Sequence, residues 1–365
     1  MIKYIGSKRV LLPGIIRAVQ AFTPARTVLD LFSGTSRVGH ELKRLGYRVL
    51  ANDHNAYAHK VAQCYIQADR EDVWDDAARL IEDFNRLQGR AGWFTETYCA
   101  RSRYLQPKNG ERVDAIREEI ARRGFEPDLE AVLLVSLMEA ADRVDSTAGL
   151  QMAYLKQWSQ RSYNTLQMRL PDVLPRARHG KGEAHCLDAF DAADLLEGDV
   201  AYIDPPYNQH SYLGNYHVWE SLVRWDKPEV YGVACKRVDC RTRQSRFNSK
   251  RECTAAMGKV LSSVRASALV VSFNNEGFLT RAELEAMLAG LWDGCARVVT
   301  FERDYKRYVG AQIGIYNPKG EKVGKVSHLR NTEYLYVACS PKAEAWVDSL
   351  AAGVGKATEQ MTLLG

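Results

Sequence analysis

The apolar positions of the chain fall into short runs that predict buried strands. β-Branched and aromatic residues recur in these runs, as expected of side chains that pack on a pleated surface. The runs are residues 27–32, 47–53, 185–189, 200–203 and 268–274. Val298–Arg303 and Glu333–Ala338 alternate apolar and polar positions instead, which predicts a closing antiparallel pair. The pattern as a whole predicts an α/β fold with a mixed sheet.

The middle of the chain has a different apolar period. Apolar residues lie three and four apart in Asp76–Leu87, Glu111–Arg123 and Asp128–Val144, which predicts helices. This helical stretch is longer than an ordinary crossover between strands, so it predicts an insertion. We expect a discontinuous main domain around a mostly helical insertion, followed by a C-terminal helix and tail. The expected boundaries are residues 1–70 and 180–340 for the main domain, 71–179 for the insertion and 341–365 for the helix and tail.

Composition narrows the class of protein. The chain has 365 residues, 46% of them hydrophobic, and a net charge of +5. No apolar run approaches the length of a membrane span, and Met1–Arg9 lacks the apolar core of a signal peptide. The eight cysteines are scattered without a Cys-x-x-Cys pair, so we expect reduced thiols and no metal site, even near Cys235 and Cys240. A cytoplasmic monomer is expected.

A polar corner follows the run at residues 200–203 and reads Asp204, Pro205, Pro206, Tyr207. Two consecutive prolines lack backbone donors and fix φ, so they end a strand and stiffen the turn. At the carboxyl edge of an open α/β sheet ligands bind, and such a corner suits a flat heterocycle. The Asp204 carboxylate and the Pro205 carbonyl can accept both hydrogens of an exocyclic amine, while the Tyr207 ring lies against the base. These four residues are the predicted catalytic residues; the alternative is a turn that merely ends a strand.

A second loop, Ser33-Gly34-Thr35-Ser36, follows the run that ends at Phe32. Asp53 closes the next run about twenty residues later, the interval at which an acid meets the hydroxyls of a ribose. The loop is not Gly-x-Gly-x-x-Gly, because Ser36 stands where a pyrophosphate loop needs glycine. This disfavours a dinucleotide oxidoreductase and favours a nucleoside without phosphates. S-adenosylmethionine (SAM) is such a ligand.

Basic residues gather in three parts of the chain. Lys236–Arg251 holds seven cations with amide and aromatic residues among them, which predicts a mobile arm for a polyanion; a solubilising loop is the alternative. Arg101–Asn109 predicts a basic, aromatic loop, and Lys306–Lys325 a second basic projection. The predicted nucleic-acid contacts are Arg101, Arg103, Lys156, Tyr212, Lys236, Arg237, Arg241, Arg243, Arg246, Lys250, Arg251, Lys306 and Arg307.

With these motifs the chain resembles the Dam-like DNA adenine methyltransferases. Lys3–Lys8 is similar to their N-terminal motif, Asp30–Thr35 to their cofactor loop and Asp204–Tyr207 to their catalytic motif. The order is also theirs: cofactor half, target-recognition insertion, catalytic half. The resemblance departs at Ser36, where many members have a second glycine. It implies a Rossmann-like, SAM-dependent methyltransferase fold and says little about the insertion.

The resemblance also implies roles residue by residue. Tyr4 and Lys8 would contact the amino-acid end of SAM, and Asp53 the ribose hydroxyls. The residues that would line the methionine and ribose portion are Asp30, Phe32, Ser33, Gly34 and Thr35, and those that would meet the adenine ring are Asp188 and Ala189. Asp204 would face the target amine.

The expected function is transfer of the SAM methyl group to the exocyclic amine of a flipped-out adenine in double-stranded DNA. We expect an orphan methylase or part of a restriction–modification system, with a cognate restriction endonuclease as partner in the second case. A cytosine-N4 methyltransferase would use nearly the same corner. RNA or protein-glutamine methyltransferases would share the cofactor half. In a different class, a DNA-binding protein could keep the fold and lack activity.

Overall fold

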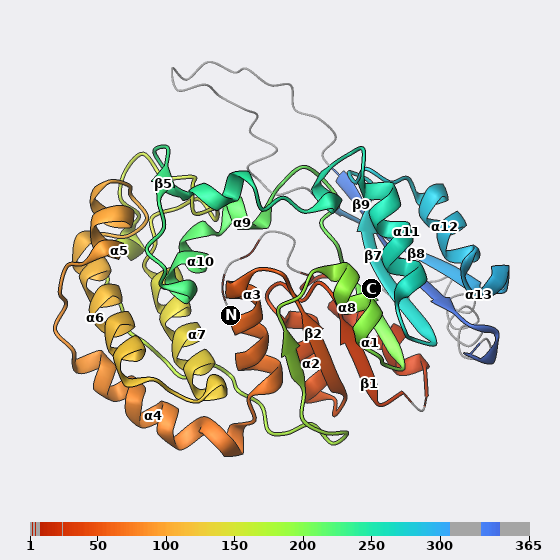
Figure 1. Ribbon diagram of the computed structural model, residues 1–365, viewed down its shortest axis with the longest axis horizontal. Coiled ribbons are helices and arrows are strands. Elements are labelled where there is room, and N and C mark those ends of the chain that lie inside the picture. The colour runs from red at the N-terminus through yellow and green to blue at the C-terminus, as the bar shows by residue number, and fades with distance from the viewer. Residues whose placement is uncertain (1, 3, 5–7, 24, 307–329, 344–365) are drawn as a thin grey trace. The chain divides into compact units, whose positions relative to one another are not determined.

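The computed structural model describes residues 2, 4, 8–23, 25–306 and 330–343 (Figure 1). The chain divides into two compact units. The first unit comprises Met1–Arg9, Ala25–Asp199 and His210–Ser245, and the second Val10–Pro24, Val200–Gln209 and Arg246–Gly365. Arg307, most of the predicted projection up to Lys325, and residues 344–365 of the predicted tail lie outside the described residues.

The sheet of the first unit has three parallel strands in the order β3-β2-β1. They are β1 (Thr27–Asp30), β2 (Arg48–Asn52) and β3 (Glu183–His185). Val28 pairs with Val49, and Leu50 with Glu183. Helix α2 (Arg37–Arg44) joins β1 to β2, which makes the β-α-β unit that the sequence predicts.

Helix α7 (Pro127–Arg143) is deeply buried in the first unit: every residue from Ala131 to Asp142 is buried. A helix that is apolar nearly all round belongs inside a bundle. Its neighbours include α3 (Ala56–Ala62), α4 (Arg70–Arg86), α6 (Pro107–Arg123) and α10 (His217–Arg224). The shorter elements are η1 (Gln63–Gln67), α5 (Trp93–Thr95), η2 (Glu96–Ala100), η3 (Gln160–Tyr163), α8 (Ala189–Leu195), α9 (Tyr212–Asn215), β5 (Val230–Tyr231), β6 (Lys236–Arg237) and η4 (Val238–Arg241).

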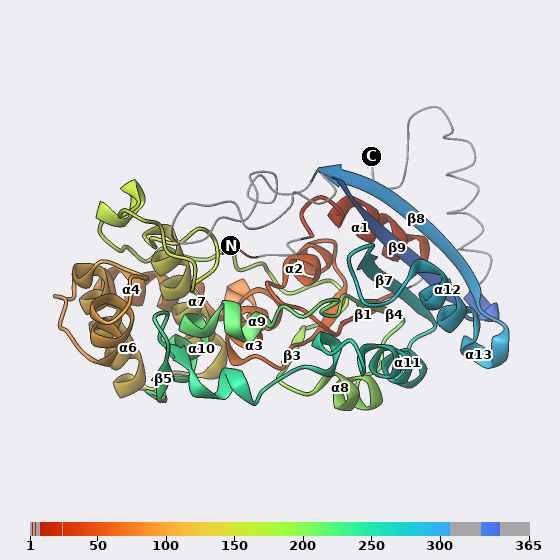
Figure 2. The same cartoon turned by 90° about the horizontal axis from the view of Figure 1, so that it is seen from above.

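The second unit has four strands in the order β4-β7-β9-β8. β4 (Val200–Ile203) runs parallel to β7 (Ala268–Asn274), while β9 (Arg330–Cys339) runs antiparallel to both β7 and β8 (Arg297–Lys306). Figure 2 shows β8 and β9 as the long closing pair, and Val298 faces Ala338 in their register. The helices are α1 (Leu12–Ala21), η5 (Arg246–Asn248), α11 (Cys253–Ser263), α12 (Arg281–Ala289), α13 (Leu291–Gly294) and η6 (Pro341–Ala343).

These strands confirm the predicted α/β class with a mixed, mostly parallel sheet. The predicted closing pair is also confirmed. The predicted strand at residues 185–189 is wrong in extent, because β3 ends at His185 and α8 begins at Ala189. Asp188 causes the change: its carboxylate accepts the Phe190 N–H and caps the helix. The division into a main domain and an inserted target-recognition domain stays a proposal.

Candidate active site

The loop after β1 is tied to the ends of two strands. The Ser33 hydroxyl donates to Asp30 Oδ2 at 3.0 Å and lies 3.1 Å from the Ser36 hydroxyl. The Ser33 amide donates to the Asn52 carbonyl at the end of β2, at 2.9 Å. Asp30, Ser33, Thr35 and Ser36 are all buried. The loop is therefore fixed where the sequence predicts a cofactor to bind.

Two residues of this loop adopt the left-handed backbone conformation. Gly34 has φ +53° and Ser36 has φ 57°, immediately before α2 begins. The Ser36 amide donates to the Ser33 carbonyl at 2.7 Å and closes the turn. The loop thus makes a glycine-type turn although its second glycine position holds serine. Ser36 adopts a backbone conformation that glycine adopts more readily than serine.

Asp53 is held from both sides by backbone and side-chain donors. Its Oδ2 accepts the Gly34 amide at 3.0 Å, and its Oδ1 accepts the Asn55 amide at 2.9 Å and the Asn55 side-chain amide at 3.1 Å. An ionised carboxylate offers about four lone-pair positions. Three bonds leave room on Oδ2 for one hydroxyl hydrogen without displacing a protein donor. The half-buried Asp53 therefore fits a ribose hydroxyl.

Sequence reasoning missed Asn52, the residue before this acid. Its side-chain amide donates to the Leu31 carbonyl at 3.3 Å and the Leu187 carbonyl at 3.2 Å, and its oxygen accepts the Leu187 amide at 3.0 Å. The fully buried Asn52 thus joins the cofactor loop to the segment that carries Asp188 and Ala189. Asp188 is exposed and caps α8, whereas Ala189 is half-buried.

Tyr4 lies inside a stack of aromatic rings. Its ring lies 5.1 Å from that of Tyr212 and 4.5 Å from that of Tyr216, both nearly parallel. Its hydroxyl is 3.2 Å from the Tyr57 hydroxyl, and an added Cβ at Gly34 would lie 3.5 Å from its ring. Burial and the neighbouring Tyr57 raise the pKa of Tyr4 well above its ordinary value, so the phenol stays neutral. Tyr212, predicted to contact DNA, is a stacking partner of Tyr4.

The second unit carries the Asp204–Tyr207 corner directly after β4. Asp204 is half-buried and Pro205 is buried. The Tyr207 carbonyl accepts the Phe278 amide at 2.9 Å, and the Asn208 carbonyl accepts the Asn248 side-chain amide at 2.7 Å. Since two prolines cannot donate to a ladder, these two bonds fix the corner from outside the strand.

Phe273 and Gly277 support the Tyr207 ring. Tyr207 and Phe273 meet edge to face, with centroids 5.8 Å apart. The Phe273 ring packs directly against Gly277, where an added Cβ would lie 2.2 Å from a ring carbon. Sequence reasoning missed both residues, although an aromatic four residues before a glycine was visible at the end of the run at 268–274.

Several of the residues predicted to contact DNA lie at the surface. Arg101, Lys156 and Arg241 are exposed, as are Arg246, Lys250 and Arg251. Two guanidiniums lie over aromatic rings: Arg241 is 3.9 Å from the Tyr231 ring centroid and Arg103 is 4.9 Å from that of Trp158. Lys236 is half-buried in β6, and the side chain of Lys306 lies outside the described part of the chain.

Arg237 does not belong with these surface cations. Its side chain is 2% exposed, and it forms ion pairs with Asp226 at 2.7 Å and Asp239 at 3.0 Å. Burial lowers the pKa of Arg237, but the bonds to Asp226 and Asp239 outweigh burial and raise it. Arg237 is therefore a structural residue, and its buried side chain is not placed to contact DNA.

The predicted mobile arm is folded. Lys236–Arg251 contains β6, η4 and η5, and Arg243 bonds to residues far along the chain. The segment Arg101–Asn109, predicted as a basic loop, is also packed into the fold. Tyr104 and Asn109 are buried, and Lys108 lies in the first turn of α6. Charge composition alone did not show that acids elsewhere pair with these cations.

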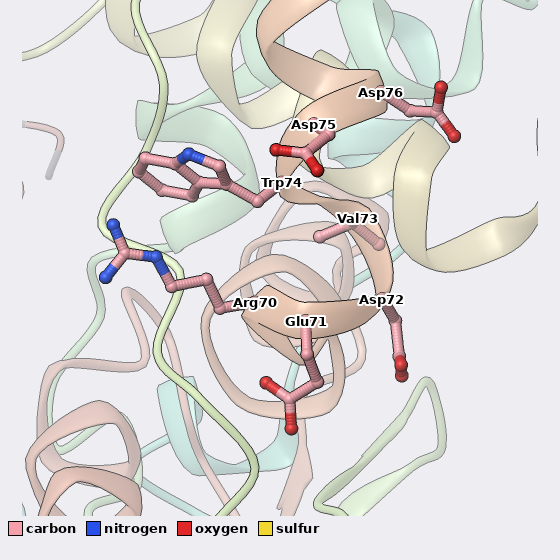
Figure 3. Close-up of a pocket in the computed structure, with 7 residues that line it drawn as sticks. All are labelled: Arg70, Glu71, Asp72, Val73, Trp74, Asp75 and Asp76. Atoms are coloured by element: carbon pink, nitrogen blue, oxygen red, sulfur yellow. The ribbon is translucent and has the colours of Figure 1, made fainter.

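A surface hollow at the start of α4 takes no part in the predicted site. It is lined by Arg70, Glu71, Asp72, Val73, Trp74, Asp75 and Asp76 (Figure 3). Arg70 lies over the Trp74 ring, 4.0 Å from its centroid. None of these residues belongs to the predicted cofactor or catalytic set.

Among the residues that the structure describes, His, Cys, Asp and Glu side chains form no group of three or more that could hold a metal ion. Within the same described ranges, no helix is both long enough and apolar enough to cross a membrane.

A mixed α/β sheet with a loop–helix unit after β1 and an acid after β2 defines a Rossmann-like methyltransferase fold. Residues 4–277 match the model of the D12 class N6 adenine-specific DNA methyltransferases, and the chain belongs to this family. A reaction of this family requires a methyl donor and a DNA substrate.

The similar proteins include several named methylases. The chain is 28% identical over 302 residues to the modification methylase StsI of Streptococcus sanguinis, covering 78% of this chain and 46% of that protein. It is 29% identical over 305 residues to the type II methyltransferase M.FokI of Planomicrobium okeanokoites, covering 78% and 46%. It is 27% identical over 318 residues to the type II methyltransferase M.NlaIII of Neisseria lactamica, covering 84% and 89%. The chain thus spans about half the length of the first two relatives.

Proposed function

We propose that this protein methylates the exocyclic N6 amine of adenine in double-stranded DNA, with SAM as the methyl donor. The observation that carries the proposal is the Asp204-Pro205-Pro206-Tyr207 corner at the carboxyl end of β4, braced by Phe278 and Asn248. Membership of the N6 adenine-specific family favours adenine over cytosine as the target.

The residues of the first unit fit a nucleoside donor without phosphates. Asp53 keeps one acceptor position for a ribose hydroxyl, and Gly34 adds no side chain of its own beside that acid. Tyr4 and Lys8 would hold the amino-acid end, and Asp188 with Ala189 the adenine ring. The wider set also includes Asp30, Phe32, Ser33 and Thr35. When bound, SAM supplies a methyl group activated by its sulfonium.

The second unit supplies the groups that hold the target amine. The Asp204 carboxylate and the Pro205 carbonyl would accept the two amine hydrogens, which favours a pyramidal nitrogen with its lone pair available. Pro206 keeps these acceptors rigid, and the Tyr207 ring would stack on the base. Asp204 acts as an orienting acceptor, and the surplus proton leaves to solvent.

A base inside a duplex cannot reach such a corner, so the target adenine must be flipped out at a cost of a few kcal/mol. Contacts from surface cations to phosphates would offset this cost. The cations proposed for this role are Arg101, Arg103, Lys156, Lys236, Arg241, Arg246, Lys250 and Arg251.

Replacing the orienting acid tests this function directly. Asp204→Ala removes the principal acceptor of the amine, so methyl transfer to DNA should fall at least about a hundredfold. SAM affinity, measured by calorimetry, should stay near the wild-type value. Asp194→Ala removes an exposed acid elsewhere and should transfer normally. Wild-type turnover in the Asp204 variant would contradict the proposal.

We also propose the biological system in which the reaction takes place. Relatives named as modification or type II methyltransferases support a place in a restriction–modification system, with a cognate endonuclease as partner. An orphan methylase, a monomeric state and a cytoplasmic location stay predictions from the sequence.

A further inference from the structure

Arg243 reaches the turn that carries the proposed ribose-binding acid. Its guanidinium donates to the His54 carbonyl at 3.2 Å, to Glu220 Oε1 at 2.8 Å and to Asp239 Oδ2 at 3.4 Å. The three acceptors lie on three separate segments. A planar fork of donors suits such an arrangement better than the single ammonium of a lysine.

Glu220 accepts a hydrogen bond from the other end of the same turn. Its Oε2 accepts the backbone amide of Tyr57 at 3.1 Å, at the start of α3. Glu220 is fully buried on α10, so its charge requires a partner, and Arg243 is the nearest cation. Arg243 and Glu220 therefore form one unit that holds a carbonyl and an amide of the segment His54–Tyr57.

This segment determines the position of Asp53. Asn55 lies between His54 and Tyr57, the two residues that bond to Arg243 and Glu220. It donates twice to Asp53 Oδ1, while Gly34 donates to Oδ2. A shift of the turn would change the direction of the carboxylate relative to the cofactor loop. Neither Arg243 nor Glu220 is a hydrogen-bond partner of Asp53 itself.

We propose that Arg243 and Glu220 are positioning residues that hold Asp53 in the orientation needed to bind the ribose of SAM. The proposal rests on the proposed function because it names that cofactor. It also reassigns Arg243, whose place in a basic segment predicts a DNA contact, to the cofactor side of the reaction.

The first test needs no cofactor. In ligand-free protein, Arg243→Ala should increase hydrogen exchange at the Asn55 and Tyr57 amides, whose bonds depend on the held turn. Arg79→Ala is the control, because Arg79 is an exposed arginine on α4 that pairs with Asp76 and belongs to no proposed site. Unchanged exchange at Tyr57 in Arg243→Ala would overturn the proposal.

The second test is a double-mutant cycle on SAM affinity, measured by calorimetry. Arg243→Ala should weaken binding about tenfold, while the control Arg79→Ala leaves SAM binding unchanged. In an Asp53→Ala background, the further change of Arg243 should have little effect, because the residue acts through the missing acid. Additive losses would show that Arg243 stabilises the fold only, and would refute the proposal.

Arg243→Lys covers the case in which the alanine variant does not fold. It keeps a cation beside Glu220 but cannot span to His54, so an intermediate loss of SAM affinity is expected. Wild-type affinity in this variant would count against the proposal. If wild-type protein itself fails to bind SAM, the proposed function fails, while the exchange experiment still decides whether the turn is held as described.

Discussion

At the scale of single residues, Ser36 combines an unfavourable backbone with a useful side chain. A non-glycine residue in the left-handed region costs about 1 kcal/mol, and a buried hydroxyl hydrogen bond contributes about as much. Ser36→Ala loses the bond to Ser33 and keeps the strain, whereas Ser36→Gly loses both. The glycine variant should therefore be more stable than the alanine variant by about 1 kcal/mol in urea unfolding. An alanine variant of equal or greater stability would contradict this account of the loop.

The buried His217 should make the free energy of unfolding depend on pH. Its side chain is fully buried, and its Nε2 donates to the Ala234 carbonyl at 2.9 Å. Burial lowers the pKa of His217 from 6.5 to about 4. Between these values the unfolded chain binds a proton that the folded protein does not. The free energy of unfolding should therefore fall as the pH drops from 6.5 to 4, by about 3 kcal/mol in total.

A substitution isolates this contribution. His217→Gln keeps a donor for the Ala234 carbonyl and cannot take up the proton, so its unfolding free energy should depend less on pH in this window. The exposed His179→Gln is the control and should keep the wild-type slope. Urea unfolding between pH 7 and pH 4 measures the effect. An equal slope in wild type and His217→Gln would exclude His217 as its source.

At the scale of elements, the end of β7 supports the catalytic corner. Gly277→Ala would force the Phe273 ring away and disturb the edge that meets Tyr207. We expect kcat for methyl transfer to fall about tenfold, because a small displacement at the reacting base is costly, with SAM affinity unchanged. Gly258→Ala, in α11 with open space around it, should leave kcat unaltered. Normal kcat in Gly277→Ala would show that Phe273 does not position Tyr207.

The elements that sequence patterns predicted well are those whose signal is local. The run at 268–274 matches β7, and the helical period at Glu111–Arg123 falls within α6. Asp188 was wrongly predicted to lie in a strand, because the apolar run at 185–189 contains a helix cap at this position. The Lys236–Arg251 segment was misread because two of the acids that pair with its arginines, Glu220 and Asp226, lie outside it in sequence.

The same distinction applies to the candidate site. Gly34, Asp53 and the Asp204 corner follow from spacing along the chain, since each acid closes its own strand. Asn248, by contrast, bonds to Asn208 across forty residues, and Asn52 to Leu187 across 135. Such partners have no local pattern, because the fold alone brings them together.

At the scale of the whole molecule, the chain divides its proposed chemistry between two units. The first unit carries the residues proposed to hold the methyl donor, and the second carries the corner proposed to hold the amine. The match to the family model covers residues 4–277 and so includes both sets of residues. The surface cations proposed to bind phosphates occur in both units, from Arg101 in the first to Arg251 in the second.

The identity of the methylated base tests the central claim most directly. Unmethylated plasmid DNA should be incubated with the purified protein and SAM, digested to nucleosides and analysed by mass spectrometry. The account predicts N6-methyldeoxyadenosine, and none with Asp204→Ala. N4-methyldeoxycytidine as the product, or no methylated nucleoside from a wild-type protein that binds both SAM and DNA, would contradict it.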